Sequence, residues 1–355
     1  MTQDLAINLL LNKLREIPKE QHCAWFADEN SLEALPLLAA NHPKLALCTN
    51  RYDIHAQALA LGINSVFNDV NLAEIITPKT QHLFIRISKE KPVTHHTINQ
   101  AAQQLHGNAS LHIAGLKGEG IKTYLKKTQA LFFQKVPVKK DKDAHYSGFS
   151  SPDKHAAPLE TQNYDELRNI GDINNQTLLS KPGVFGYEKI DEGSELLLTT
   201  AHAHLKDNAI KPHSQLDLGC GYGLLTFGSR HWGNQRFTAT DNNAAALIAI
   251  AAGAKANNIN VDIIAADAGA EIDDAYDCIL CNPPFHQGFS ISGDLTDKFL
   301  KQASQKLTPD GIAFFVVNSF IGIEQKATQY FKKQETLVNN KKFKVLVLSH
   351  QKLQK

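Results

Sequence analysis

Residues 216–225 read Leu-Asp-Leu-Gly-Cys-Gly-Tyr-Gly-Leu-Leu, an apolar run that enters a glycine-rich turn and then a second apolar segment. Glycine adopts backbone angles that other residues avoid, and it lets a ligand approach the main chain closely. Unpaired N–H groups at the start of a following helix favour an anionic group. The stretch therefore predicts a strand, a cofactor-binding loop and a helix, with Asp217, Gly219, Cys220 and Gly221 as cofactor-binding residues and an α/β fold around them.

This loop departs from the dinucleotide fingerprint G-x-G-x-x-G. Leu224 stands three residues after Gly221, and an acid, Asp217, stands two residues before the first glycine. A nicotinamide-dependent oxidoreductase would need a better match. A plain strand-to-helix turn remains the alternative for the loop taken alone.

The next expected strand, residues 236–240, ends at Asp241, twenty residues beyond Gly221. An acid at this place in an α/β fold accepts hydrogen bonds from ribose hydroxyls, so Asp241 and its neighbour Asn242 are predicted to bind the cofactor. Asp241 could instead be the N-cap of the helix that follows.

A third expected strand, residues 261–266, ends at Asp267. Its carboxylate is placed to accept a hydrogen bond from an adenine amino group, and we include Asp267 and Ala268 in the cofactor site. A simple acidic turn residue is the alternative.

The fourth expected strand, residues 276–281, runs into Asn282-Pro283-Pro284-Phe285. Two consecutive prolines fix φ near −65° and remove two donors, and the residue before a proline is held near extended geometry. Such a stiff corner can hold a planar amine, so these four residues are predicted to be catalytic, and Asn282 to touch the cofactor as well. An ordinary strand-ending turn is the alternative.

These four features all lie at the carboxyl ends of consecutive strands, where open α/β sheets bind their ligands. Four weak sequence signals are much less likely to agree by chance than one such signal is to occur by chance. Together they indicate a methyltransferase that acts on an amino group.

The chain also resembles a known family, the class I S-adenosylmethionine-dependent methyltransferases. Within that family it resembles two related types of ribosomal RNA guanine-N2 methyltransferase: type C, which acts on the small ribosomal subunit, and type G, which acts on the large one. The resemblance covers the chain. It is carried by Asn-Pro-Pro-Phe-His at 282–286, by the segments 181–185 and 190–198, and by the final stretch 339–345, whereas residues 186–189 replace a stretch that often begins with Ser-Arg.

The resemblance implies two tandem Rossmann-like methyltransferase domains, each seven-stranded and doubly wound, with the N-terminal one degenerate. It also implies S-adenosylmethionine as the cofactor and N2-methylation of a specific guanosine, in 16S rRNA of the small subunit. Ribosomal RNA or the small ribosomal subunit would be the partner. The alternatives are a guanine in 23S rRNA, a DNA base or a protein glutamine.

Our hypothesis for the reaction is in-line methyl transfer to the guanine exocyclic N2. The Asn282 side-chain oxygen and the Pro283 carbonyl would accept its two N–H bonds and align the nitrogen. Phe285 would stack on the base.

Length and composition point to two domains, since 355 residues with 43% hydrophobic content can build more than one core. We expect a degenerate methyltransferase-like domain over 1–140, a proline-containing linker over 141–165 and the catalytic domain over 166–355. The first domain repeats the strand and helix alternation, but residues 27–31 contain no glycine and Ser-Lys-Glu at 88–90 stands in place of Asn-Pro-Pro. Its role would be to hold RNA or to support its partner.

The formal net charge of +1 shows no overall basic bias, so RNA binding must depend on local patches. Residues 117–142 and 321–355 each hold eight lysines against two acids. Such clusters can follow phosphates, although a solvated charged surface is the alternative for each. A non-catalytic RNA-binding protein is therefore a rival hypothesis, which the intact corner at Asn282 opposes for the second domain only.

The five cysteines do not suggest a disulfide framework, and no signal segment is recognised, so we expect a cytoplasmic monomer. Cys278 and Cys281 are three residues apart on an expected strand and point to opposite faces, so no metal site is predicted. His95 and His96 are expected in solvent or at turns. The longest apolar stretch, 244–252, is too short to span a bilayer, and no membrane association is predicted.

Overall fold

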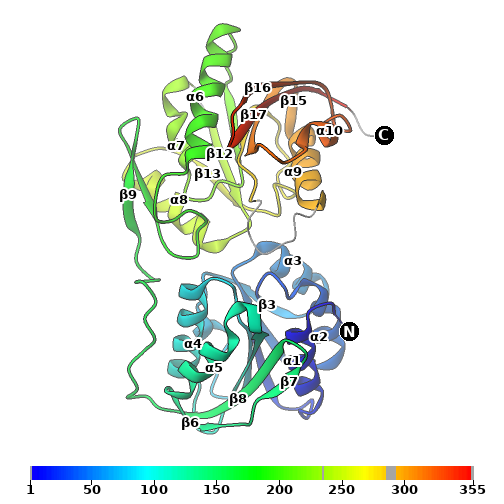
Figure 1. Cartoon of the computed structure of the whole chain (residues 1–355), viewed down its shortest axis with the longest axis vertical. Helices are drawn as coiled ribbons and strands as arrows, with labels where there is room; N and C mark the ends of the chain where they lie inside the picture. Colours follow the sequence, from blue (N-terminus) through cyan, green and yellow to red (C-terminus); the bar gives the residue numbers. More distant parts are fainter. Residues whose placement is uncertain (1, 234–235, 285–292, 353–355) are drawn as a thin grey trace. The chain divides into compact units, whose positions relative to one another are not determined.

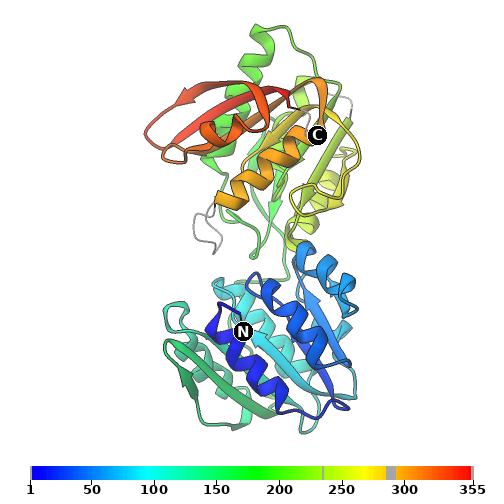
Figure 2. The same ribbon diagram turned by 90° about the vertical axis from the view of Figure 1, so that its right-hand side faces the viewer.

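The computed structural model describes residues 2–233, 236–284 and 293–352. The chain divides into two compact units, Met1–Tyr164 and Asp165–Lys355, which Figures 1 and 2 show in two views. Each unit is a mixed α/β domain around one main sheet, which confirms the predicted fold class.

The second unit contains a seven-stranded sheet in the order β13-β12-β11-β14-β15-β17-β16. The first five strands of this order run parallel, and the last two join antiparallel. Its strands are β11 (Ser214–Leu218), β12 (Arg236–Asp241), β13 (Asp262–Ala265), β14 (Tyr276–Cys281), β15 (Leu307–Asn318), β16 (Phe331–Asn339) and β17 (Phe343–Gln351). A separate hairpin of β9 (Arg168–Ile173) and β10 (Gln176–Ser180) precedes them.

Helices cover both faces of this sheet because side chains of each strand alternate between the faces. In β14, Cys278 and Leu280 belong to one apolar core, whereas Ile279 and Cys281 belong to the other. The first core contains residues of α6 (Glu192–Asp207), α7 (Leu224–Gly228) and α8 (Ala244–Ala256), and the second contains residues of α9 (Gly293–Lys306) and α10 (Ile323–Ala327). The unit is therefore doubly wound, and its ligand edge is the carboxyl end of the parallel strands.

The first unit repeats this topology in the order β3-β2-β1-β4-β5-β8-β6, with the short β7 paired to β8. Its strands are β1 (His22–Phe26), β2 (Leu45–Thr49), β3 (Asn64–Phe67), β4 (Thr80–Arg86), β5 (Ser110–Leu116), β6 (Phe132–Lys135), β7 (Lys139–Asp141) and β8 (Ala144–Pro152). Its α-helices are α1 (Leu5–Arg15), α2 (Leu35–Asn41), α3 (Tyr52–Ala60), α4 (Lys91–Gln104) and α5 (Ile121–Gln129). Position by position, β1 corresponds to β11 and β4 to β14.

In the first unit, a cluster of charged side chains occupies the place that corresponds to Asn282 in the second unit. Arg86, the last residue of β4, is 1% exposed. Its guanidinium lies 2.8 Å from a carboxylate oxygen of Asp4, 2.8 Å from Glu119 and 3.8 Å from Asp28. Asp28 follows β1, where the second unit has its glycine loop. A buried cation with three acids thus occupies the carboxyl edge of this sheet.

The structure corrects the linker that we predicted over 141–165. Residues 144–152 form β8, which pairs antiparallel with β5 and β6 inside the first sheet. The linker was predicted from the prolines and the weak periodicity of this part of the chain, but pairing with β5, β6 and β7 satisfies backbone donors and acceptors of β8.

The rest of the expected linker packs against α4. The Leu159 carbonyl accepts from Asn99 Nδ2 at 2.7 Å, and the Glu160 carbonyl lies 2.6 Å from His95 Nδ1. His96 stacks on Tyr164, with ring centroids 4.4 Å apart. The expectation that these two histidines lie at the surface is wrong, because both are buried. Within the described ranges, no helix has the length and apolarity needed to cross a bilayer.

Candidate functional site

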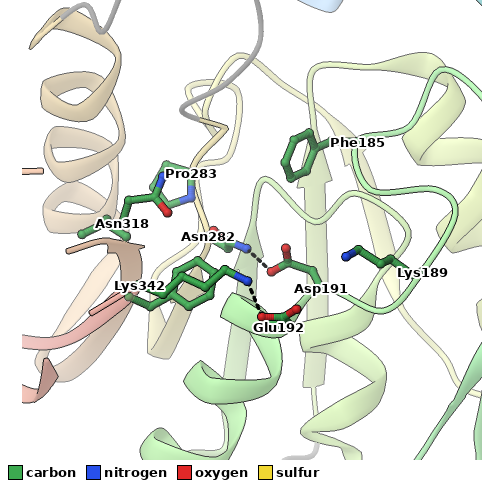
Figure 3. A pocket seen from close by; sticks show the side chains of 10 residues that line it. Phe185, Lys189, Asp191, Glu192, Asn282, Pro283, Asn318 and Lys342 are labelled. Carbon is green, nitrogen blue, oxygen red and sulfur yellow. Dashed lines mark hydrogen bonds and ion pairs between the residues drawn. The ribbon is translucent and has the colours of Figure 1, made fainter. Parts of the chain in front are cut away.

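The corner after β14 is fixed by an acid and a hydroxyl from another element. Asn282 Nδ2 donates to Asp191 Oδ2 and to Ser194 Oγ, at 2.9 Å each (Figure 3). Asp191 is the N-cap of α6 and accepts the Ser194 backbone N–H at 2.8 Å. Because both contacts engage the amide nitrogen, Asn282 Oδ1 is left as the side of the amide that can accept from a ligand.

The same network reaches the glycine loop. The Tyr222 hydroxyl accepts the backbone N–H of Asp191 at 3.2 Å, and Tyr222 is buried between the loop and α7. The residues that hold the Asn282 amide are therefore connected to the predicted cofactor loop by direct hydrogen bonds.

A pocket of about 200 Å³ opens beside Asn282 and Pro283. A dry cavity of about 150 Å³ is enough to hold benzene, so this pocket has the size for a planar base. Figure 3 shows its wall, built from the loop before α6, the start of α6, the ends of β14 and β15, and the hairpin turn between β16 and β17. The lining residues are Phe185, Lys189, Asp191, Glu192, Asn282, Pro283, Val317, Asn318, Lys342 and Phe343.

The acids at the pocket are compensated. Glu192 forms an ion pair with Lys342 across the pocket mouth, and this hydrogen bond lowers the pKa of the Glu192 carboxyl. Asp191 accepts hydrogen bonds from two residues, as described above. Lys189 is exposed on the same wall. The mouth of the pocket thus combines engaged carboxylates with accessible lysine side chains.

The amide donors at the beginning of the glycine loop bind acceptors at the end of the neighbouring strand β12. The N–H groups of Gly219 and Cys220 donate to the Thr240 carbonyl at 3.0 and 2.9 Å, and the N–H of Gly221 donates to Asp241 Oδ2 at 2.9 Å. These donors are therefore used inside the protein. A Cβ added at Gly221, where φ is +54°, would meet nothing within 4 Å, so the main chain here faces open space.

Asp241 joins the glycine loop to the start of α8. Its Oδ2 accepts from Gly221, and its Oδ1 accepts from the Asn243 N–H at 2.9 Å. The N-cap of α8 is Asn243, whose side chain accepts from the Ala245 N–H at 2.9 Å, so Asp241 is not the cap. Asn242 lies between the two in the chain.

Asp217 lies beneath the loop and is fully buried. Its Oδ2 accepts from the Thr226 N–H at 2.9 Å and from Thr226 Oγ1 at 2.7 Å, which fixes α7. In the part of the chain that the structure describes, Asp217 Oδ1 has no hydrogen-bond partner. Burial raises the pKa of this carboxyl to about 7.

Asp267 and Ala268 lie at the end of β13, beside Asp241. The Ala266 N–H donates to the Asp241 carbonyl at 3.1 Å, which brings the two strand ends together. The Asp267 carboxylate is ion-paired with Lys298 of α9, so its predicted adenine contact would compete with this lysine. Ala268 has φ of +53° and is buried.

Parallel pairing thus brings the predicted cofactor residues to one edge of one sheet, with Asn282 and Pro283 at its neighbouring corner. Pro284 is partly buried in that corner. Phe285 lies outside the described residues. No group of three or more His, Cys, Asp or Glu side chains that could hold a metal is found among residues 2–233, 236–284 and 293–352.

Sequence reasoning missed Asp191 and Lys342 as pocket residues and Ser194 as a partner of the Asn282 amide. A signal for Asp191 and Ser194 was present, because Gly193 stands in the first turn of a helix, where glycine costs about 1 kcal/mol relative to alanine and needs a packing reason. A Cβ at Gly193 would lie 3.2 Å from Asp191 Oδ2 and 3.2 Å from Phe343 Cε1. The close approach of the hairpin to the start of α6 therefore leaves little room for a side chain at this position.

Comparisons with known proteins agree with this geometry. A sequence model of the family described as "Methyltransferase small domain" matches residues 175–347. The ribosomal RNA small subunit methyltransferase C of Erwinia tasmaniensis is 34% identical over 177 residues, which is 50% of this chain and 49% of that protein. The chain thus spans about half the length of this relative. The protein of the same name from Photorhabdus laumondii is 28% identical over 336 residues, 93% of this chain and 94% of its own.

Among solved structures, the T. thermophilus 16S rRNA methyltransferase RsmC, in complex with AdoMet and guanosine, superposes with a TM-score of 0.83 at 23% identity, covering 98% of this chain and 92% of its own. The two-unit fold is shared. The predicted resemblance to the type C methyltransferases of the small ribosomal subunit is confirmed. Residues 175–347 match the methyltransferase small domain, and over 336 residues the chain is similar to the ribosomal RNA small subunit methyltransferase C of Photorhabdus laumondii.

Proposed function

We propose that the chain is an S-adenosylmethionine-dependent methyltransferase that acts on the exocyclic N2 of a guanosine in 16S ribosomal RNA. The observation that carries the proposal is the Asn282 amide, which lines a base-sized pocket and whose nitrogen is held by Asp191 and Ser194. The names of the relatives and the guanosine bound to the T. thermophilus protein support the same substrate class.

The residues at the sheet edge fit S-adenosylmethionine, which supplies a methyl group on a positively charged sulfur when bound. Gly221 offers close access to the main chain of the loop that Gly219 and Cys220 begin, and Asp241 would supply its carboxylate to a ribose diol. The internal use of the loop amides suits this phosphate-free cofactor better than a dinucleotide, whose pyrophosphate needs free N–H donors. Asn242, Asp267 and Ala268 would complete the adenosine side, and Asp217 would support the loop from beneath.

The corner would position the reacting nitrogen by accepting its hydrogen atoms. Asn282 Oδ1 would accept one N–H of the guanine amine and the Pro283 carbonyl the other, which turns the nitrogen lone pair out of conjugation with the ring. The prolines keep the two acceptors at a fixed separation. A preorganised hydrogen-bonding group of this kind contributes about 2.7 to 4 kcal/mol to a transition state, and alignment contributes more. Stacking by Phe285 remains a prediction.

Asp191 would act through Asn282 and not on the substrate. The negative charge of Asp191 attracts the Nδ2 group of Asn282, so the amide is oriented before the base binds. The proton on the methylated nitrogen leaves from an already cationic amine, so no strong general base is required.

Label transfer from tritiated S-adenosylmethionine tests the proposal. Small subunits, naked 16S rRNA, large subunits with 23S rRNA, DNA and a glutamine-containing protein substrate are incubated separately, and the labelled product is digested and identified by mass. We expect N2-methylguanosine at a single position of 16S rRNA. Label in 23S rRNA, in DNA or in protein glutamine would replace the substrate assignment with that alternative. If none of the substrates is labelled, the proposed methyltransferase activity is refuted.

We further propose that residues 166–355 hold the catalytic site and that the first unit has no cofactor site, since the Arg86 cluster fills the equivalent place. The first unit would hold RNA or support its partner. All five cysteines are unpaired and buried, which suits a cytoplasmic protein. We expect the protein to act as a monomer, which size-exclusion chromatography with light scattering can check.

A further inference from the structure

The turn after β15 presents an exposed aromatic side chain close in the chain to a pocket residue. Phe320 is 70% exposed. The turn that carries it is closed by a hydrogen bond from the Ile321 N–H to the Asn318 carbonyl at 3.0 Å. Asn318 lines the pocket, so Phe320 follows a pocket residue by two positions. A large apolar side chain held in solvent at this place suggests a surface for a ligand that continues beyond the pocket.

This turn is tied to the lysine-bearing hairpin turn between β16 and β17. The Ser319 N–H donates to the Lys342 carbonyl at 3.0 Å, and Ser319 Oγ donates to the Lys341 carbonyl at 3.0 Å. The hairpin turn is itself fixed, because Asn340 Oδ1 accepts the Lys342 N–H at 2.8 Å. Phe320, Lys341 and Lys342, which we call the Phe320 surface, are therefore carried by two joined turns.

The charge of the Phe320 surface favours a polyanion. The side chains of Lys341 and Lys342 are exposed, and Lys341 makes no ion pair in the described part of the chain. Nearby acids are already paired, Glu192 with Lys342 and Glu324 with Lys344. A phosphate could displace Glu192 from Lys342, since both groups of that pair are more than half exposed.

Size also agrees with a nucleotide strand. Two residues span at most about 7 Å, and successive nucleotides in a stacked strand rise about 3.4 Å each. A base in the pocket beside Asn318 would thus have a neighbour, one or two nucleotides away, within reach of Phe320. Single-stranded nucleic acids bind proteins through this combination of an exposed aromatic side chain and lysines along the backbone.

We propose that the Phe320 surface binds the single-stranded RNA that flanks the target guanosine, with Phe320 stacked on an adjacent base and Lys341 and Lys342 against its phosphates. The inference rests on the proposed function for the identity of the base in the pocket. It adds a binding subsite that begins at Lys342, which lines the pocket, and continues to Lys341 and Phe320.

The test measures binding of a fluorescein-labelled RNA pentamer with a central guanosine, by anisotropy, to the full chain saturated with S-adenosylhomocysteine. Phe320→Ala should weaken binding about tenfold, which corresponds to about 1.4 kcal/mol and lies within the range for loss of one stacked base. Phe320→Trp should retain the affinity. Ile248→Ala is the control, because Ile248 is 44% exposed on α8 and does not line the pocket, and it should change nothing. Lys341→Gln should reduce the salt dependence, by about 0.7 in the slope of log K against log salt.

Methyl transfer to the small subunit is measured on the same variants. Phe320→Ala should raise the KM for this substrate about tenfold and leave kcat within twofold. Pentamer binding that Phe320→Ala leaves unchanged, or no measurable binding by the unmodified chain, would overturn the Phe320 surface even if methylation proceeds. Phe320-dependent binding with no methyl transfer by the unmodified chain would instead retain the surface and refute the proposed function.

Discussion

Replacing Asp191 with asparagine tests how the corner is oriented, because it removes one charge and little else. Asp191 Oδ2 accepts Asn282 Nδ2 at 2.9 Å and the Ser194 N–H at 2.8 Å. Asparagine caps helices about as well as aspartate, so α6 should keep its start. With a neutral partner, however, the Asn282 amide loses the charge that favours its present orientation.

The size of the effect follows from the two kinds of hydrogen bond. A hydrogen bond to a charged group contributes about 1.5 to 3 kcal/mol and a neutral one about 0.5 to 1.5 kcal/mol. The substitution therefore removes about 1 to 1.5 kcal/mol of the free energy that favours the present orientation of the Asn282 amide. If that difference is expressed in the transition state, kcat for methyl transfer falls about five- to tenfold. Cofactor affinity should stay within twofold, because Asp191 does not belong to the glycine loop.

Single-turnover methyl transfer at saturating cofactor gives the rate, calorimetry gives the affinity for S-adenosylhomocysteine, and urea unfolding gives the stability. Asp172→Asn is the matched control, since Asp172 is an exposed acid on β9 that accepts from Thr177 Oγ1 at 2.9 Å, away from the pocket. Its rate should equal that of the unmodified chain. A normal rate in Asp191→Asn would refute the orienting role, and a loss of rate matched by a loss of stability would assign Asp191 to folding alone.

Three other predictions address the corner, the first unit and the buried acid. Asn282→Ala should lower kcat by about 100- to 1,000-fold with unchanged cofactor affinity, and near-normal turnover in the label assay would contradict the role of its oxygen. Arg86→Met should cost about 3 to 5 kcal/mol of unfolding free energy in urea, because it leaves buried acids without their cation, while calorimetry should show the same cofactor affinity; lost affinity would indicate a cofactor role for the first unit. The pKa of Asp217 is raised to about 7 in the folded state. Between about pH 4 and 7 the folded chain therefore holds a proton that the unfolded chain has released. The contribution of this group to the unfolding free energy falls as the pH rises through that range. Asp217→Asn should remove this dependence, so the unfolding free energy of the variant in urea should rise relative to that of the unmodified chain between pH 5 and 7.5. If the unfolding free energies of the two proteins change in parallel with pH, the argument about the buried acid is contradicted.

The sequence predicted the sheet edge well because its signals are local. The glycine loop, Asp241 and Asn282 each follow an apolar run, and parallel pairing of those runs necessarily brings their ends together.

What the sequence did not predict depends on contacts between distant segments. Asp191 meets Asn282 across 91 positions of sequence, and Lys342 meets Glu192 across 150. The strand at 144–152 was predicted to be a linker because of the prolines and the weak periodicity of this part of the chain, and only pairing with its neighbours makes it a strand. The sequence also did not predict that amides of the glycine loop donate to acceptors within the protein, because those acceptors lie on the next strand.

A crystal structure with S-adenosylhomocysteine and guanosine tests the central claim most directly. The account predicts the cofactor product on the glycine loop of the second unit and the guanine in the pocket, with its exocyclic nitrogen within about 3.2 Å of Asn282 Oδ1, the usual limit for such a bond. A guanine bound elsewhere, or one whose amine faces away from Asn282, would contradict it.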